Sequence, residues 1–352
     1  MINKFSKRLE NIQAEIIFAL GKIDELKGRW ATGIELSPQV LGRLKRSVLI
    51  TSTGASTRIE GVKLSNKAIE KVMRGLNIQK FADRDKQEVQ GYYELLENVF
   101  NSWKTLKFNE SSIKSFHKEL LKYSDKDQGH LGNYKFGENK VVAYDTDGKL
   151  GVVFNPTVPH LVPKEMTELL EATNLFLSKK RYHPLLIIAN FVIEFLKIHP
   201  FQDGNGRMSR VLTNLLLLQN SYLYMPYISH EKYVEDNKSE YYLALHNSQK
   251  TFGSENESLA PWLDFFFSVL LKQAESAIDL MSKENIEKLL SEKQLAVWEF
   301  IQDLNVFSTG NVVSGTEIAR PTVKQVLDVL LRLKKIERIG QGRGARYKII
   351  KK

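Results

Sequence analysis

The chain has 352 residues, of which 26% are charged, with a net charge of +10 and no cysteine. This length suffices for two or three domains with a substantial core, and the lack of cysteine excludes disulfides and thiolate metal sites. The most apolar stretch carries Asn190, Glu194 and Lys197, which argues against a membrane span, and the N-terminus lacks a signal-peptide core. We therefore expect a soluble, cytoplasmic protein with no membrane partner.

Apolar residues at helical spacing predict that most of the N-terminal part is helical. Two stripes carry this pattern and are more typical of a core than of cofactor contacts: Phe5, Leu9, Ile12, Ile16, Leu20 and Ile23, and then Val89, Tyr92, Tyr93, Leu96, Val99, Phe100 and Trp103. Between them lies Ser56-Thr57-Arg58-Ile59-Glu60-Gly61. Gly61 is typical of a helix stop, so we expect Glu60 at the end of a short helix.

Residues 132–156 predict a short β-hairpin, because Val, Tyr and Phe surround turn signals at Gly137 and Asp147-Gly148. We expect this hairpin to include Tyr134, Lys135, Val141 and Val142. On this pattern alone it could be a plain surface hairpin.

The most informative stretch is a loop between two apolar helices. Pro184 suits the first position of a helix over residues 184–198, and Pro200 prevents its continuation. A second helix is predicted to begin near Arg207. The loop and the start of that helix read His199-Pro200-Phe201-Gln202-Asp203-Gly204-Asn205-Gly206-Arg207-Met208-Ser209-Arg210.

Each residue type in this loop suits the handling of a nucleotide phosphate tail. Gly204 and Gly206 allow backbone N–H groups to converge on an anion at a helix N-terminus. Arg207 and Arg210 are three residues apart and share a helix face that can grip phosphates. Asp203 is a hard oxygen ligand for Mg²⁺, and His199 could deprotonate an attacking hydroxyl.

Taken singly, these features are weak. A lone histidine after a helix is more often structural, a Gly-x-Gly pattern is common, and two arginines on one face usually meet solvent or a carboxylate. The twelve residues together favour an enzyme that performs in-line phosphoryl chemistry.

The C-terminal part is basic, since residues 293–352 carry 12 Lys and Arg against 5 Asp and Glu. After a linker or connecting helix over 281–292, we expect a helix over 294–304 and a polar link containing Ser308 and Gly310. A brief helix around 316–319, a helix over 322–333 and a Gly-tipped hairpin should follow. This order resembles a winged helix-turn-helix, in which phosphate contacts of DNA would come from Lys324, Lys334, Lys335, Arg343 and Arg346. The alternative is a module for protein docking or dimerisation.

The loop resembles the signature of the Fic family, His-Pro-Phe-x-Asp/Glu-Gly-Asn-Gly/Lys-Arg-x-x-Arg, at every defined position. The resemblance extends over roughly residues 50–250. It implies a mostly α fold: a helical N-terminal region over 1–110, a helical-bundle core with a β-hairpin flap over 111–280, and the winged-helix domain over 290–352. The hairpin over 132–156 resembles this flap, which would hold a target segment by strand addition with Tyr134, Lys135, Val141 and Val142.

This resemblance also implies an activity. The protein would be a protein adenylyltransferase that moves AMP from ATP to a Ser, Thr or Tyr hydroxyl of a target protein, which could be itself. His199 would be the general base, Asp203 would hold Mg²⁺, and Asn205, with the loop amides of residues 204–206, would hold the α-phosphate. Arg207 and Arg210 would contact the β- and γ-phosphates.

Residues 56–61 are similar to the inhibitory motif of such proteins, Ser/Thr-x-x-x-Glu-Gly/Asn, defined here by Ser56, Glu60 and Gly61. Glu60 would then pair with Arg210 and exclude the γ-phosphate. The alternative is that Glu60 and Gly61 are an ordinary helix end. A homodimer could control Glu60. Two other functions stay open: removal of AMP or another transfer at the same site, and a DNA-binding regulator whose Fic fold senses nucleotide.

Overall fold

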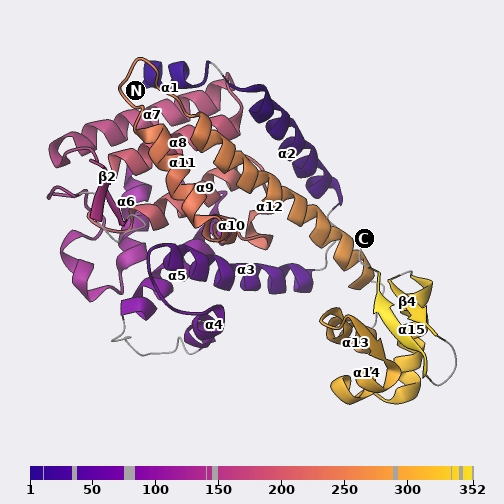
Figure 1. Cartoon of the computed structure of the whole chain (residues 1–352). Coiled ribbons are helices and arrows are strands. Elements are labelled where there is room, and N and C mark those ends of the chain that lie inside the picture. Colours follow the sequence, from indigo (N-terminus) through magenta and orange to yellow (C-terminus); the bar gives the residue numbers. More distant parts are fainter. Residues whose placement is uncertain are drawn as a thin grey trace. The chain divides into compact units, whose positions relative to one another are not determined.

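The computed structural model describes residues 1–10, 12–33, 38–74, 84–139, 141–144, 150–287, 292–333, 335–340 and 344–350. The chain divides into two compact units, Met1–Ile278 and Asp279–Lys352 (Figure 1). Within these ranges, no helix has the length and apolar character that a membrane crossing requires.

In its described residues, the regular structure of the first unit is helical apart from one hairpin, in agreement with the predicted mostly α fold. Its α-helices are α1 (Ile2–Arg8), α2 (Ala14–Gly33), α3 (Pro38–Ile59), α4 (Asn66–Arg74), α5 (Arg84–Ser102), α6 (Glu110–Leu121), α7 (Val162–Lys179), α8 (Pro184–Ile198), α9 (Asn205–Gln219), α10 (His230–Asp236), α11 (Lys238–Gln249) and α12 (Ala260–Glu287), which continues into the second unit. Short 3₁₀ turns are η1 (Asp125–His130), η2 (Pro159–Leu161) and η3 (Met225–Tyr227).

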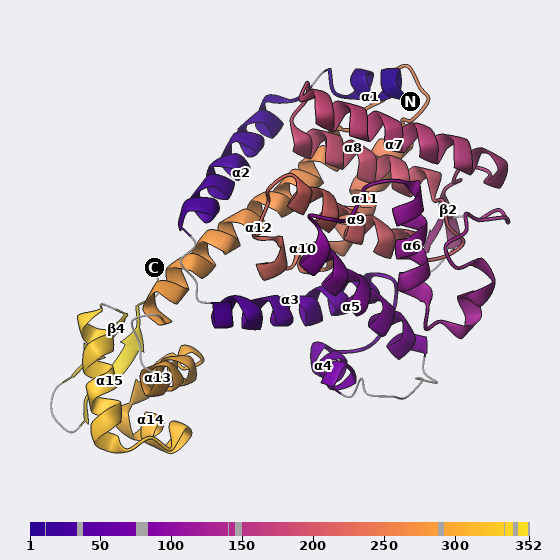
Figure 2. The ribbon, with the colours of Figure 1, turned by 180° about the vertical axis from the view of Figure 1, so that it is seen from behind.

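Helices α8 and α9 form the centre of this unit, with other helices on several sides (Figures 1 and 2). α8 packs against α7 and α9, and α9 also packs against α5. Both are buried around most of their circumference, as expected for helices with apolar residues on every face. α8 begins at Pro184, as predicted, whereas α9 begins at Asn205, two residues before the predicted start.

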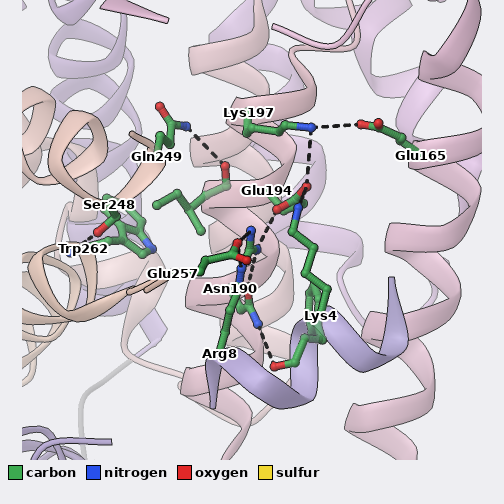
Figure 3. Close-up of polar contacts among 12 residues, drawn as sticks. Lys4, Arg8, Glu165, Asn190, Glu194, Lys197, Ser248, Gln249, Glu257 and Trp262 are labelled. Carbon is green, nitrogen blue, oxygen red and sulfur yellow. Dashed lines mark hydrogen bonds and ion pairs between the residues drawn. The ribbon is translucent and has the colours of Figure 1, made fainter. Parts of the chain in front are cut away.

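Buried ion pairs attach the N-terminal helix α1 to this centre (Figure 3). Arg8 donates from Nη1 to the Glu194 Oε2 atom at 2.6 Å, and Lys4 Nζ lies 3.1 Å from Glu194 Oε1. The Arg8 Nε atom donates to Glu257 at 2.6 Å. Burial would raise the pKa of Glu194, but the charges of Arg8, Lys4 and Lys197 together lower it, so the carboxylate stays ionised.

The hairpin pairs β1 (Val141–Tyr144) with β2 (Leu150–Phe154) in antiparallel register, with an irregularity between Val141 and Val142. The predicted hairpin is therefore present, but its turn at Asp147-Gly148 lies outside the described residues. Tyr134 and Lys135 are not part of it, because residues 133–139 run against the loop after α8 instead.

The inhibitory-motif helix also differs from its prediction. Glu60 follows α3, which has 22 residues and is therefore long. Gly61 adopts a φ of +105°, a conformation that glycine reaches easily, and this explains the end of the helix at Ile59.

The second unit combines three helices and a small sheet: α13 (Glu292–Gln302), β3 (Val306–Ser308), α14 (Thr309–Thr316), α15 (Arg320–Arg332), β4 (Ile336–Ile339) and β5 (Arg346–Ile349). The antiparallel strands have the order β3-β5-β4. A separate core packs the helices onto the sheet and includes Val297, Ile301, Phe307, Val326 and Leu330.

Two predictions for this unit were wrong. Ser308, expected in a polar link with Gly310, ends strand β3, and the brief helix spans Thr309–Thr316 in place of 316–319. Ser308 and Asn311 form a capping box that starts α14 at Thr309, and Glu317, with a left-handed φ of 56°, ends it. Lys334 and Arg343, two of the expected DNA contacts, lie outside the described residues.

The Arg8–Glu194 pair leads to a stability prediction. Replacing Glu194 with Ala removes one of the two carboxylates that pair with the buried Arg8 guanidinium, and we expect a loss of about 3–5 kcal/mol in the free energy of unfolding. The matched control is Glu25→Ala, which removes an exposed partner of Lys22 and should leave the melting temperature nearly unchanged. Thermal unfolding of both variants measures the difference, and equal melting temperatures would contradict the stabilising role of the pair.

Candidate active site

The predicted phosphate loop connects the two central helices of the first unit. α8 ends at Ile198, and His199 adopts a left-handed φ of 52° while its N–H donates to the Phe195 carbonyl at 2.9 Å. The chain turns again at Gly204, whose φ is 81°, before α9 starts. Because of these two turns, His199 and the first turn of α9 belong to one compact loop.

The His199 ring is half-buried and held in one tautomer. Its Nδ1 lies 3.3 Å from the Leu196 carbonyl, which can only accept a hydrogen bond. Nδ1 therefore carries the proton, and Nε2 keeps its lone pair. Burial lowers the pKa of His199 to about 4, and the Lys135 ammonium acts in the same direction. The ring is thus neutral at physiological pH. Phe154 of β2 lies against it edge-on, with 6.3 Å between ring centroids.

The Asn205 side chain holds the loop together. Its Oδ1 accepts from the Phe201 N–H at 2.9 Å, and its Nδ2 donates to the Phe201 carbonyl at 2.8 Å. Asn205 itself is only 2% exposed. These contacts use one donor and one acceptor of the amide to hold the loop backbone, and the contact of Asn205 with the α-phosphate stays a prediction.

His117 of α6 packs against the loop and hydrogen-bonds to it, a role that no sequence pattern predicted. Its ring stacks on Phe201 with centroids 3.8 Å apart. The Gly132 N–H donates to Nδ1 at 3.0 Å, so Nε2 carries the proton that is donated to the Asp203 carbonyl at 3.1 Å. Burial lowers the pKa of His117 to about 4. A buried histidine on an amphipathic helix gives no sequence signal that separates it from core.

The Arg207 guanidinium is 2% exposed and donates to two carboxylates. Nη1 contacts Glu88 of α5 at 2.8 Å, and Nη2 contacts Asp203 at 3.2 Å. Burial would raise the pKa of Asp203, but the charges of Arg207 and Arg84 and the Gly204 N–H hold it below its ordinary value. Glu88 and Arg84 lie far from the loop in sequence, and no local motif pointed to them.

Arg210 is tied to the end of α3 by three contacts. Its Nε donates to the Ser56 hydroxyl at 2.7 Å, and Nη2 donates to the Ser56 carbonyl at 2.9 Å and to Glu60 Oε1 at 2.7 Å. The Arg210 side chain is 3% exposed and that of Glu60 is 31% exposed. The structure therefore brings Ser56 and Glu60 to Arg210, more than 140 residues away in sequence.

Gly206 leaves the space in which the Glu60 carboxylate lies. A Cβ at this position would come within 2.2 Å of Glu60 Oε1. The carboxylate consequently occupies the N-terminal turn of α9, where backbone N–H groups and the helix dipole favour an anion.

The residues expected to contact a target through the hairpin separate into two groups. Val141 and Val142 belong to strand β1. Lys135, by contrast, is buried: its N–H donates to the Pro200 carbonyl at 2.9 Å, and its Nζ donates to Asn139 at 2.8 Å. Tyr134 packs near Phe201, with 5.7 Å between ring centroids. Lys135 therefore supports the loop and adjusts the charge around His199, and it does not present itself to a target.

Asp203 is suited to a shared metal ion. Over the residues with described positions, no group of three or more His, Cys, Asp or Glu could hold a metal. The Asp203 side chain is nevertheless 38% exposed and ionised beside the anion-binding turn. One such carboxylate fits Mg²⁺ whose other ligands are phosphate oxygens and water.

Comparison with known proteins agrees with this geometry. Residues 107–217, which include α6 to most of α9, match the family model described as Fic/DOC family. A probable protein adenylyltransferase of Aquifex aeolicus is 27% identical over 188 residues, which are 52% of this chain and 52% of that protein. The chain thus spans about half the length of this curated relative.

Two solved structures share the fold. A Fic family protein from Desulfovibrio desulfuricans has a TM-score of 0.61 and 23% identity, covering 97% of this chain and 98% of its own. A Fic domain containing signaling protein from Bacteroides thetaiotaomicron has a TM-score of 0.60 and 22% identity, covering 74% and 97%. The matched segment, which contains the complete loop, shows that the chain carries a Fic domain over residues 107–217, and the two structures show that the fold is shared.

Proposed function

We propose that the protein is a protein adenylyltransferase, which transfers AMP from ATP to a Ser, Thr or Tyr hydroxyl of a target protein. The observation that carries this proposal is that His199 is neutral with a lone pair on Nε2, and that the same loop leads into the N-terminal turn of α9, which favours an anion. The name of the Aquifex relative supports the same reaction.

The chemistry needs a base, an anion site and charge stabilisation. The target hydroxyl oxygen attacks the α-phosphorus as its proton passes to His199 Nε2, the bond to the bridging oxygen breaks, and pyrophosphate leaves. Loop amides and the arginines of α9 stabilise the charge on the phosphates. Asp203 would hold Mg²⁺, which supplies further charge neutralisation. The hairpin β1–β2 would hold the target segment by strand addition.

We further propose that Glu60 inhibits this reaction. Arg210 directs its hydrogen bonds to Ser56 and Glu60, and a guanidinium engaged in this way does not bind a terminal phosphate at the same time. Glu60 is the more exposed partner, so displacing its carboxylate requires less rearrangement than moving Arg210. AMP removal remains the alternative reaction, since a carboxylate at this place could orient water.

The base and its inhibition can be tested together. With α-labelled ATP, Mg²⁺ and a cell lysate, Glu60→Gly should raise protein labelling by about tenfold or more, because roughly 1.4 kcal/mol of released competition has that effect. Adding His199→Ala should lower it by about a hundredfold or more. Unchanged labelling in Glu60→Gly would refute inhibition. Labelling that survives His199→Ala would remove His199 as the base.

The low pKa of His199 predicts an unusual pH profile. His199 accepts a proton only when neutral, so kcat/KM of Glu60→Gly should be lost only as the pH falls toward about 4. Replacing Lys135 with Met removes a positive charge, raises the pKa of His199 and should move this acid limb to higher pH. Exposed Lys118→Met is the control and should leave it unchanged. A limb near pH 6.5 in the parent protein would contradict the electrostatic argument.

A second function is favoured by the fold of the second unit. The sheet order β3-β5-β4, with α15 preceding the hairpin β4–β5, supports the winged-helix interpretation of this unit. Basic side chains are exposed on α15 and on the hairpin: Arg320, Lys324, Arg332, Arg338, Arg346 and Lys348. Lys335, the residue before β4, is half-buried. We propose that these side chains bind DNA phosphates.

Salt dependence tests the DNA proposal in the full chain. Replacing Lys324 and Arg346 with Ala should weaken binding to duplex DNA and reduce the slope of log K against log salt by about 2, since two phosphate contacts are lost. The control replaces Lys22 and Arg29 of α2 with Ala and should leave the slope unchanged. Equal slopes in all three proteins would exclude α15 and β5 as the DNA interface.

A further inference from the structure

Four charged side chains form a closed ring at one side of the phosphate loop. The Arg84 Nε atom donates to Glu88 Oε1 at 2.8 Å, and Arg207 Nη1 donates to Glu88 Oε2 at 2.8 Å. Arg207 Nη2 lies 3.2 Å from Asp203 Oδ1, and Arg84 Nη2 lies 3.7 Å from Asp203 Oδ2. Each carboxylate therefore faces both guanidiniums, and the formal charges of the ring cancel.

The members of the ring differ in exposure. The side chains of Glu88 and Arg207 are 7% and 2% exposed, whereas those of Asp203 and Arg84 are 38% and 52% exposed. Glu88 thus forms the inner side, where a carboxylate is stable only if both of its oxygens are paired. Arg84 and Asp203 form the outer side, which a ligand from solvent can reach.

Arg84 has hydrogen-bonding capacity left at this outer side. Within the ranges that the structure describes, its Nη atoms have no acceptor nearer than the 3.7 Å contact with Asp203. Its Nε bond to Glu88 fixes the plane of the guanidinium, so the two outer nitrogens point away from the anchored edge. Such a fork suits two oxygens of a phosphate.

We propose that Arg84 is a third phosphate-binding arginine of this site and that Glu88 positions it together with Arg207. This inference rests on the proposed nucleotide site and extends it. Because Arg84 neighbours Asp203 and the β-phosphate arginine Arg207, it should bind the part of the nucleotide beyond the α-phosphate. ATP and AMP should therefore differ in their dependence on Arg84.

The test measures equilibrium binding of ATP and of AMP, with Mg²⁺, in the Glu60→Gly background, where the site is open. Arg84→Ala should weaken ATP binding by about tenfold, as expected for a lost charge-assisted contact, and change AMP binding by less than about twofold. Arg84→Lys should restore part of the ATP affinity. Arg29→Ala is the matched control, since Arg29 also pairs with a glutamate four residues away but lies in α2.

Glu88→Gln tests the positioning role, because it keeps the shape of the side chain and removes its charge. It should weaken ATP binding at least as much as Arg84→Ala, again without a comparable effect on AMP. If Arg84→Ala weakens ATP and AMP equally, or neither, the proposal is overturned, whatever Glu88→Gln does. Absence of ATP binding in Glu60→Gly itself would refute the proposed nucleotide site, and normal ATP binding with an unaffected Arg84→Ala would refute this inference alone.

Discussion

Two arginines that project from α9 into the protein interior control the site. Arg207 and Arg210 are 2% and 3% exposed, and a charge so deeply buried needs partners of opposite charge. Helix α5 supplies Glu88 to the first, and the end of α3 supplies Ser56 and Glu60 to the second. The buried charges of Arg207 and Arg210 therefore help to hold α5 and the end of α3 against α9.

The partners of the two arginines differ in burial, which bears on the inhibition that we propose. Glu88 is buried and bound at both oxygens, so it cannot leave without depriving both Arg84 and Arg207 of a hydrogen-bonded carboxylate. Glu60 follows the last residue of α3, its side chain is 31% exposed, and it is followed by a glycine with positive φ. The first contact has the properties of a fixed support and the second those of a contact that can open.

The surroundings of His199 fix both its tautomer and its charge. A hydrogen bond to the Leu196 carbonyl selects the tautomer, and burial together with Lys135 keeps the ring neutral. Neither feature needs a ligand, so the base that we propose is already neutral and oriented in the structure itself. Preorganisation of this kind avoids reorientation during the reaction. His117 has the complementary task of fixing the loop backbone from the other side.

The sequence by itself determined the central helix and the chemistry of the loop. Pro184, Pro200 and the apolar spacing of 184–198 are local constraints, and the loop residues 199–210 are contiguous. The same reasoning assigned Lys135 to the hairpin and missed His117, Glu88 and Arg84. Only the tertiary structure decided these roles, because they depend on burial and on contacts between helices distant in sequence. Ser308 is a second example. Serine and asparagine are common both in polar links and at helix starts, so the sequence alone did not distinguish the capping box from a link.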